Sequence, residues 1–153
     1  MNLKFVKALF NQEVVNEVLG RIDKLSPSTN HLWGKMDVAQ MLAHNAIILE
    51  CAVGNRTPNR SYLSLGSLIK RFYYSSWPPY THRMPTDPTF IVRDQHNFEA
   101  EKVRVKNLIR QFYDGGPTKV TAHPHPVFGK LTPDQWAKGL YKHINHHLNQ
   151  FGV

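Results

Sequence analysis

The histidines near the C-terminal end of the chain are the residues best suited to chemistry. The stretch YKHINHHLNQFG, residues 141–152, contains His143, His146 and His147. In a helix, His143 and His147 lie one turn apart and about 40° apart around the axis, so both imidazoles can reach one metal ion. His146 lies about 60° to the other side of His143, so only one of the two pairings is expected to bind. An exposed basic helix end is the alternative interpretation.

A third ligand must come from another part of the chain, because two histidines make an incomplete metal site. His44, in MLAHNAIILE, is the candidate, since it lies in the segment that we expect to form the most buried helix. Burying an imidazole without a partner costs about 1–3 kcal/mol. A metal ion would remove that cost, and so would a hydrogen bond to a neighbouring helix. Spacing alone leaves both interpretations open.

Four segments with helical periodicity must position these histidines. The second segment begins at a capping residue, Asp37, and the third ends at Gly115. The fourth begins with a capping box formed by Thr132 and Gln135. Strand-like alternation is scarce, so the pattern predicts an all-α four-helix bundle in a single domain, residues 1–153. The four segments are 11–25, 37–54, 99–116 and 132–152.

The connection between the second and third segments, residues 55–97, is long and irregular. SYLSLGSLIKRFYYSS (61–76) can hold a short helix. WPPYTHRMPTDPTF (77–90) cannot continue it, because its four prolines lack the amide hydrogen that a helix needs. Long connections in compact domains are often functional, so we expect a mobile, lid-like segment near the mouth of the site.

The chain carries a net charge of +8, and much of the excess lies between Arg56 and Arg110. A basic surface can attract an acidic small molecule, an anionic lipid or a nucleic acid, or it can simply favour solubility. IKRFYYSSWPPYTHR (69–83) mixes basic and aromatic residues, as single-strand binders do. No known recognition motif accompanies it, so a nucleic-acid partner is the less favoured interpretation.

Composition limits the location and the class of the protein. A content of 41% hydrophobic and 20% charged residues is typical of a globular domain. No stretch approaches the 18 or so apolar residues of a membrane span, so no membrane partner is expected. The single cysteine, Cys51, excludes an internal disulfide framework. These features predict a cytoplasmic protein.

Two segments, LWGKMDVAQMLAHN (32–45) and HPVFGKLTPDQWAKGLYKHINHHLNQFG (125–152), carry a resemblance. They resemble the DinB-like (YfiT-like) superfamily of bacterial four-helix-bundle proteins, most closely a branch of unknown function. That superfamily has one histidine on its second helix and an H-x-x-x-H pair, often H-x-x-H-H-x-x-Q, on its last. The resemblance covers essentially the whole chain, with a loose match from about 55 to 95. The matching residues here are His44, His143, His146, His147 and Gln150.

The resemblance implies a divalent metal ion held by His44, His143 and His147. Three neutral nitrogens suit zinc, nickel or iron. Three protein ligands leave a coordination position open, as in catalytic sites. Characterised members of the superfamily include transferases and isomerases that use low-molecular-weight thiols such as bacillithiol, mycothiol or glutathione. The implied function is a metal-dependent transferase or hydrolase for a small-molecule substrate, and a non-catalytic metal- or ligand-binding bundle is the alternative.

Other polar residues have secondary roles in this interpretation. Gln150 and His146 are candidates to contact a metal-binding side chain from outside the coordination sphere and so to orient it. His146 is expected to turn outward or to support a neighbouring helix. Cys51 lies two turns from His44, and we interpret it as a small core residue. His123 and His125 alternate with prolines and are interpreted as structural. The basic residues Arg56, Arg60, Lys70 and Arg71 are candidates to steer an acidic thiol or substrate. The oligomeric state, including a homodimer, stays open.

Overall fold

The computed structural model describes residues 6–57, 67–76, 78–82, 84 and 88–153. Within these residues the regular structure is helical, and the only β-type pairing is an isolated bridge between His125 and Gly129. The all-α prediction is therefore confirmed for the described part of the chain. The α-helices are α1 (Gln12–Asp23), α2 (Val38–Ala52), α3 (Ser67–Ser75), α4 (Phe98–Gly115) and α5 (Pro133–Gln150), and two short 3₁₀ helices are η1 (Pro88–Phe90) and η2 (Pro117–Lys119).

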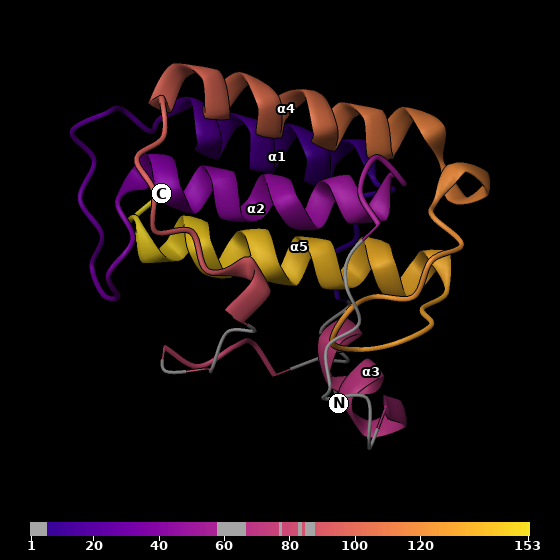
Figure 1. Cartoon of the computed structure of the whole chain (residues 1–153). Helices are drawn as coiled ribbons and strands as arrows, with labels where there is room; N and C mark the ends of the chain where they lie inside the picture. The colour runs from indigo at the N-terminus through magenta and orange to yellow at the C-terminus, as the bar shows by residue number, and fades with distance from the viewer. Residues whose placement is uncertain (1–5, 58–66, 77, 83, 85–87) are drawn as a thin grey trace, which may run out of the picture.

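The four long helices α1, α2, α4 and α5 run side by side, as in a helical bundle (Figure 1). Helix α2 packs against both α4 and α5, and α1 also contacts α4 and α5. Helices α2 and α4 point in the same direction, and α5 runs opposite to them (Figure 1). Two consecutive long helices can be parallel only if the chain between them crosses back along the bundle. The long connection between α2 and α4 meets that requirement.

Local sequence signals set the starts of the helices that carry the histidines. Asp37 accepts a hydrogen bond from the Gln40 backbone amide, and the Gln40 side chain accepts one from the Asp37 amide, so α2 begins with a capping box. Thr132 and Gln135 form the same reciprocal pair at the start of α5. Both predicted starts are confirmed. Each cap fixes the rotation of a histidine-bearing helix at one end.

The predicted end of the third long helix, at Gly115, is confirmed. Gly115 is the last residue of α4, and Gly116 follows it with a φ of 63°. Glycine adopts that left-handed conformation without the steric cost that a Cβ atom brings. The second of the two glycines is therefore the one that stops the helix.

Helix α2 is the most deeply buried element, as its nearly continuous apolar sequence predicts. Buried side chains lie on all sides of it, including Met41, Leu42 and Leu49, each exposed by 1% or less. Only a narrow stripe of this helix, with Gln40, Ile47 and Glu50, is partly exposed, and His44 and Asn45 lie outside that stripe and are buried too. No helix in the described residues is long and apolar enough to cross a membrane.

The short helix expected within residues 61–76 is present as α3, and it docks on α5. Tyr74 of α3 is buried, with a relative exposure of 1%. A Cβ atom at Gly139 of α5 would lie 1.8 Å from Cε1 of the Tyr74 ring. Any side chain at position 139 would therefore push α3 away from α5.

We predict that Gly139→Ala lowers the free energy of unfolding by about 1–3 kcal/mol, because the added methyl group overlaps the Tyr74 ring. Gly20→Ala in α1 is the matched control, since a Cβ atom there meets nothing within 4 Å. That change should raise the free energy of unfolding by about 0.5–1 kcal/mol. Urea denaturation followed by circular dichroism measures both. Equal shifts in the two variants would contradict the close approach of α3 and α5.

Candidate metal centre

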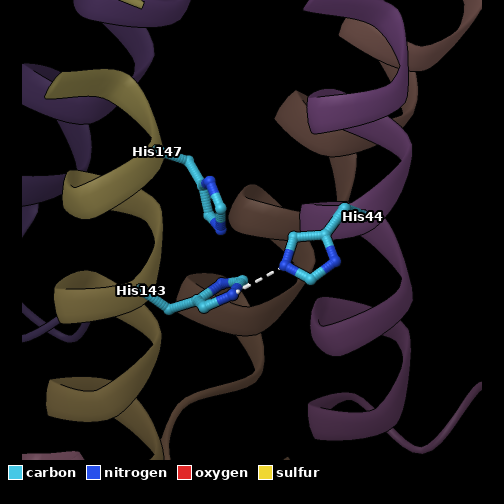
Figure 2. A group of neighbouring side chains, drawn as sticks. All are labelled: His44, His143 and His147. Carbon is cyan, nitrogen blue, oxygen red and sulfur yellow. Dashed lines mark hydrogen bonds between the residues drawn. The ribbon is translucent and has the colours of Figure 1, made fainter. Parts of the chain in front are cut away.

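Helices α2 and α5 bring the three predicted histidines together (Figure 2). His44 projects from α2, and His143 and His147 project from successive turns of α5 (Figure 2). The ring centroids of the three pairs lie 4.9, 4.8 and 4.7 Å apart. One nitrogen from each imidazole lies within 4.8 Å of the other two. The cluster has the composition and proximity that a three-histidine metal site requires.

The orientation of His44 is fixed by a backbone carbonyl from the middle connection. Its Nδ1 lies 2.7 Å from the oxygen of Phe90, the last residue of η1. A carbonyl oxygen can only accept, so Nδ1 carries the proton and Nε2 carries the lone pair. Nε2 is the nitrogen that faces His143, at 3.0 Å. The ring therefore presents its metal-binding atom to the centre of the cluster.

Gln150 fixes His147 in the same way. The side-chain nitrogen of Gln150 donates to the carbonyl of Trp33 at 2.7 Å, which turns its oxygen towards Nδ1 of His147 at 2.8 Å. That oxygen accepts, so Nδ1 of His147 holds the proton and Nε2 the lone pair. A Cβ atom at Gly34 would lie 2.3 Å from the side-chain nitrogen of Gln150. Glycine at position 34 therefore makes room for this contact, and the expected contact between Gln150 and a candidate ligand is present.

His143 completes the cluster, and one of its ring nitrogens lacks a hydrogen-bond partner in the part of the chain that the structure describes. Because Nε2 of His44 carries a lone pair, the hydrogen bond between the two rings requires a proton on Nε2 of His143. Nδ1 of His143 is then a buried acceptor, and it has no hydrogen-bond partner among the residues described. A buried nitrogen in that state costs about 1–3 kcal/mol. Moving the proton to Nδ1 would free Nε2 for a ligand role.

The spacing of the cluster suits a small cation. Two nitrogens that bind one zinc ion at about 2.0–2.1 Å in a tetrahedral site lie ~3.4 Å apart. The 3.0 Å between the Nε2 atoms of His44 and His143 is close to that value. All three ligand atoms lie within 4.8 Å of one another, which is the proximity that binding to one ion requires.

Burial keeps these imidazoles neutral. Loss of hydration lowers the pKa of His44, although the Phe90 carbonyl partly opposes the shift. Loss of hydration, together with the neighbouring imidazoles, lowers the pKa of His143 well below its usual range. The same causes, desolvation first, lower the pKa of His147 to about 3. Only neutral imidazole binds a metal, so no proton has to be removed from the cluster at neutral pH.

The three histidines form part of the wall of a cavity of about 210 Å³. Its other walls come from α2, from the middle connection and from the loop before α5. They are mostly apolar or aromatic, and they include Ile48, Tyr80, Phe90 and Phe128. No Asp, Glu, Lys or Arg is found among the described residues that line it. The three histidines therefore face a partly open cavity that is large enough for a small molecule.

His146 lies at the edge of the cluster and outside the set of three. Its ring lines the cavity and packs against Tyr80 and Trp33, with centroids 5.8 and 6.0 Å away. Of the two expected roles, support of neighbouring segments matches this position, and an outward orientation does not. Cys51 is a core residue, as its interpretation predicts, because its exposure is 3% and it does not line the cavity. Burial raises the pKa of its thiol to about 11.

His125 has the structural role expected of it and a further one that the sequence does not indicate. Its Nδ1 accepts hydrogen bonds from the amides of Val127 and Phe128, which holds the turn after His125. Its ring is also buried and lines the cavity, whereas His123 is exposed. Tyr74, Tyr80 and Phe90 line the cavity as well and were not among the predicted site residues. The aromatic residues concentrated in 72–90 are the signal that points to a packed wall.

The structure describes only some of the basic residues that are expected to steer a substrate. Arg56 lies 3.5 Å from Glu50, and Nε of Arg71 donates to the carbonyl of Phe128 at 3.1 Å. Arg60 and the side chain of Lys70 lie outside the described part of the structure. Steering of an acidic molecule by these groups stays a prediction.

The chain belongs to the DUF1569 family of proteins of unknown function, whose model matches residues 7–152. In the two other comparisons, no curated protein and no solved structure matches the chain. The family match includes both helices that carry the histidines. The cluster is therefore part of the family domain, and its function must be argued from its geometry.

We predict that the metal-free protein loses stability as the pH falls below about 6.5, the ordinary pKa of histidine in an unfolded chain. The folded pKa values of the cluster are lowered, so the unfolded chain binds more protons in this range. Each buried histidine then contributes up to about 1.4 kcal/mol per pH unit to the slope. The dependence of the free energy of unfolding on pH is measured by urea denaturation in the presence of a chelator, at a series of pH values.

His147→Gln removes one of these proton-binding differences, so its stability should depend less steeply on pH than that of the wild type. His123→Gln, at an exposed histidine, is the control and should keep the wild-type slope. If all three proteins show the same slope between pH 7 and 5, the cluster is not neutral and buried in solution.

Proposed function

We propose that this DUF1569 protein binds a divalent metal ion through His44, His143 and His147 and acts with it on a small molecule. One observation carries the proposal. His44 and His147, from two helices, each have their Nδ1 proton held by an oxygen, so that their Nε2 lone pairs converge on His143. Outer hydrogen bonds of this kind orient the histidine ligands of metal sites.

The donor set suggests which ions would bind. Three neutral imidazoles suit zinc, nickel or iron(II) and give calcium or magnesium no oxygen ligands. With three protein ligands, at least one coordination position stays open, which is typical of catalytic sites. When bound, such an ion supplies Lewis acidity that activates a water molecule or a low-molecular-weight thiol.

The chain's own residues hold the ligands and line the cavity beside them. The Phe90 carbonyl and Gln150 keep two imidazoles in the ligating tautomer. Apolar and aromatic side chains line the cavity, and where they displace water they strengthen electrostatic interactions. Cys51 does not line the cavity, so the chain offers no thiol of its own. A nucleophile must therefore come from outside, as water or as a small thiol.

The resemblance to the DinB-like superfamily supports a transferase that uses such a thiol, or a hydrolase. The side-by-side arrangement of α1, α2, α4 and α5 is compatible with that fold. A bundle that binds a metal or ligand without catalysis is the competing function. The cavity beside the histidines favours the enzyme-like function, because a purely structural zinc site is closed by four protein ligands.

The structure gives less support to nucleic-acid binding. Single-strand binders stack bases on exposed aromatic rings. Two aromatic residues of the segment 69–83 that suggests this function, Tyr74 and Tyr80, line the cavity beside the histidines instead. Phe72 is exposed by 69%, and it is the one exposed phenylalanine or tyrosine ring among the residues of this segment that the structure describes, which is a small platform for stacking.

We predict that untagged wild-type protein binds zinc at micromolar or lower concentration and that His147→Ala abolishes this binding, because it removes one of three ligands. His146→Ala is the matched control, since His146 is the adjacent histidine and lies outside the set of three. The His146→Ala substitution should change the zinc affinity by less than the roughly 10–100-fold change that is typical of an outer-shell substitution. Isothermal titration calorimetry and elemental analysis measure both. Equal zinc binding by the two variants, or none by the wild type, would show that the assignment is wrong.

We also predict that the cobalt(II)-substituted protein has a position open to an external thiol. Adding glutathione should produce a sulfur-to-cobalt charge-transfer band in the absorption spectrum, because a thiolate enters the open position. S-methylglutathione, which has no free thiol, is the control and should leave the spectrum unchanged. A spectrum that does not respond to any small thiol would favour hydrolysis or a non-catalytic role.

A further inference from the structure

The cavity beside the histidines is notable for the groups that line it. Its described lining consists of apolar side chains, phenols and imidazoles, without a carboxylate, ammonium or guanidinium group. The Nε2 atoms of His44 and His143 share one hydrogen bond, which requires that His44, whose Nδ1 proton is held by Phe90, is uncharged. The pKa of Tyr80 is raised by burial, so its phenol is uncharged as well. A ligand in this space finds no side-chain charge to pair with.

Lys142 is a cation close to the cavity wall, and its ammonium group is already engaged. Lys142 lies behind the wall, with its ammonium group 4.5 Å from the centroid of the Tyr80 ring. Its Nζ donates to the carbonyl oxygens of Tyr73 and Ser76, where α3 ends. Lys142 therefore fastens α3 to α5, and it does not line the space where a ligand would lie.

The volume of the cavity limits the size of its occupant. An apolar protein cavity of about 150 Å³ is large enough to bind benzene. The cavity here, at about 210 Å³, therefore has room for one ring with a small substituent. A tripeptide thiol or a thiol with sugar groups is much larger and carries charges. Such a thiol would have to stay mostly outside the cavity.

Hydrogen bonding is the third constraint on the kind of molecule that the cavity can bind. Nε2 of His147 carries a lone pair, because its Nδ1 proton is held by Gln150, whereas the lone pair on Nε2 of His44 accepts the hydrogen bond from His143. A molecule that reaches Nε2 of His147 in the metal-free protein should donate a hydrogen bond to it. A hydroxyl or thiol group attached to an apolar body has that property.

We infer that the cavity binds a small, uncharged, mainly apolar molecule, about the size of one substituted ring, with a protic group directed at the histidines. The inference rests on the proposed function for the identity of the site and adds the class of substrate. In a thiol-dependent reaction this molecule would be the partner of the thiol. The basic residues of the middle connection would then have no part in selecting it.

The test uses three probes with the same ring and different charge: benzyl alcohol, benzylamine as its cation, and benzoate. Binding to the full-length protein is measured by NMR titration at neutral pH with a chelator present, so that no metal contributes. Benzyl alcohol should bind, and each ion should bind at least about tenfold more weakly, because burying an unpaired charge is costly. Binding of either ion as tightly as benzyl alcohol would overturn the inference, and so would the absence of benzyl alcohol binding.

Variants test whether binding occurs in this cavity. Val127 lines the cavity and is partly buried, and Val120 is equally partly buried but lies outside it. Val127→Phe should weaken benzyl alcohol binding about tenfold by filling the space, and Val120→Phe should leave it within about twofold. Ile48→Phe, from the α2 side of the cavity, is a second filling variant. Unchanged binding in both filling variants would overturn the inference.

The metal-free design separates this inference from the proposed function. If zinc binds and benzyl alcohol does not, the substrate class is wrong and the metal site stands. If benzyl alcohol binds selectively and zinc does not, the cavity assignment stands and the proposed metal function is wrong.

Discussion

Three imidazoles packed between two helices, two of them buried and His143 partly buried, are the constraint on which the rest of this structure depends. Buried polar rings need partners, and two of these rings find them in the Phe90 carbonyl and the Gln150 side chain. The third, His143, is left with a buried nitrogen that has no partner in the described structure. A core that served only stability would hold apolar side chains here. The cost of keeping histidines is explained if the cluster has a ligand.

This constraint ties distant parts of the chain to one site. The middle connection supplies the carbonyl that orients His44, and the loop between α1 and α2 supplies the Trp33 carbonyl that orients Gln150. Helix α3 is held on α5 by the fit of Tyr74 over Gly139 and by Lys142 at its end. The middle connection is thus a wall of the cavity as well as a support of one ligand. Its expected mobility as a lid stays a prediction.

The sequence predicts the residues that helical periodicity controls and misses those that loops supply. Spacing along one helix makes His143 and His147 candidates, and the place of His44 in an apolar helix makes it a third. The resemblance to the DinB-like superfamily implies the complete set and adds Gln150. The Phe90 carbonyl and the Tyr80 ring could not be found in this way. They lie in a proline-rich segment with no period, so their positions depend on tertiary contacts alone. Backbone carbonyls are also invisible to any reading of side-chain types.

The basic net charge of the protein and the uncharged lining of its cavity suggest different kinds of binding partner. The net charge of +8 suggests an acidic partner, yet several basic groups are already paired with carboxylates. Arg104 contacts Glu50 and Glu101, and Arg56 also contacts Glu50. Exposed charge is screened by salt within about 8–10 Å, whereas the cavity wall acts on a ligand by direct contact. Under the proposed function, selection of a substrate would therefore depend on the uncharged wall, and the basic surface would act on solubility and on the approach of anions to the protein.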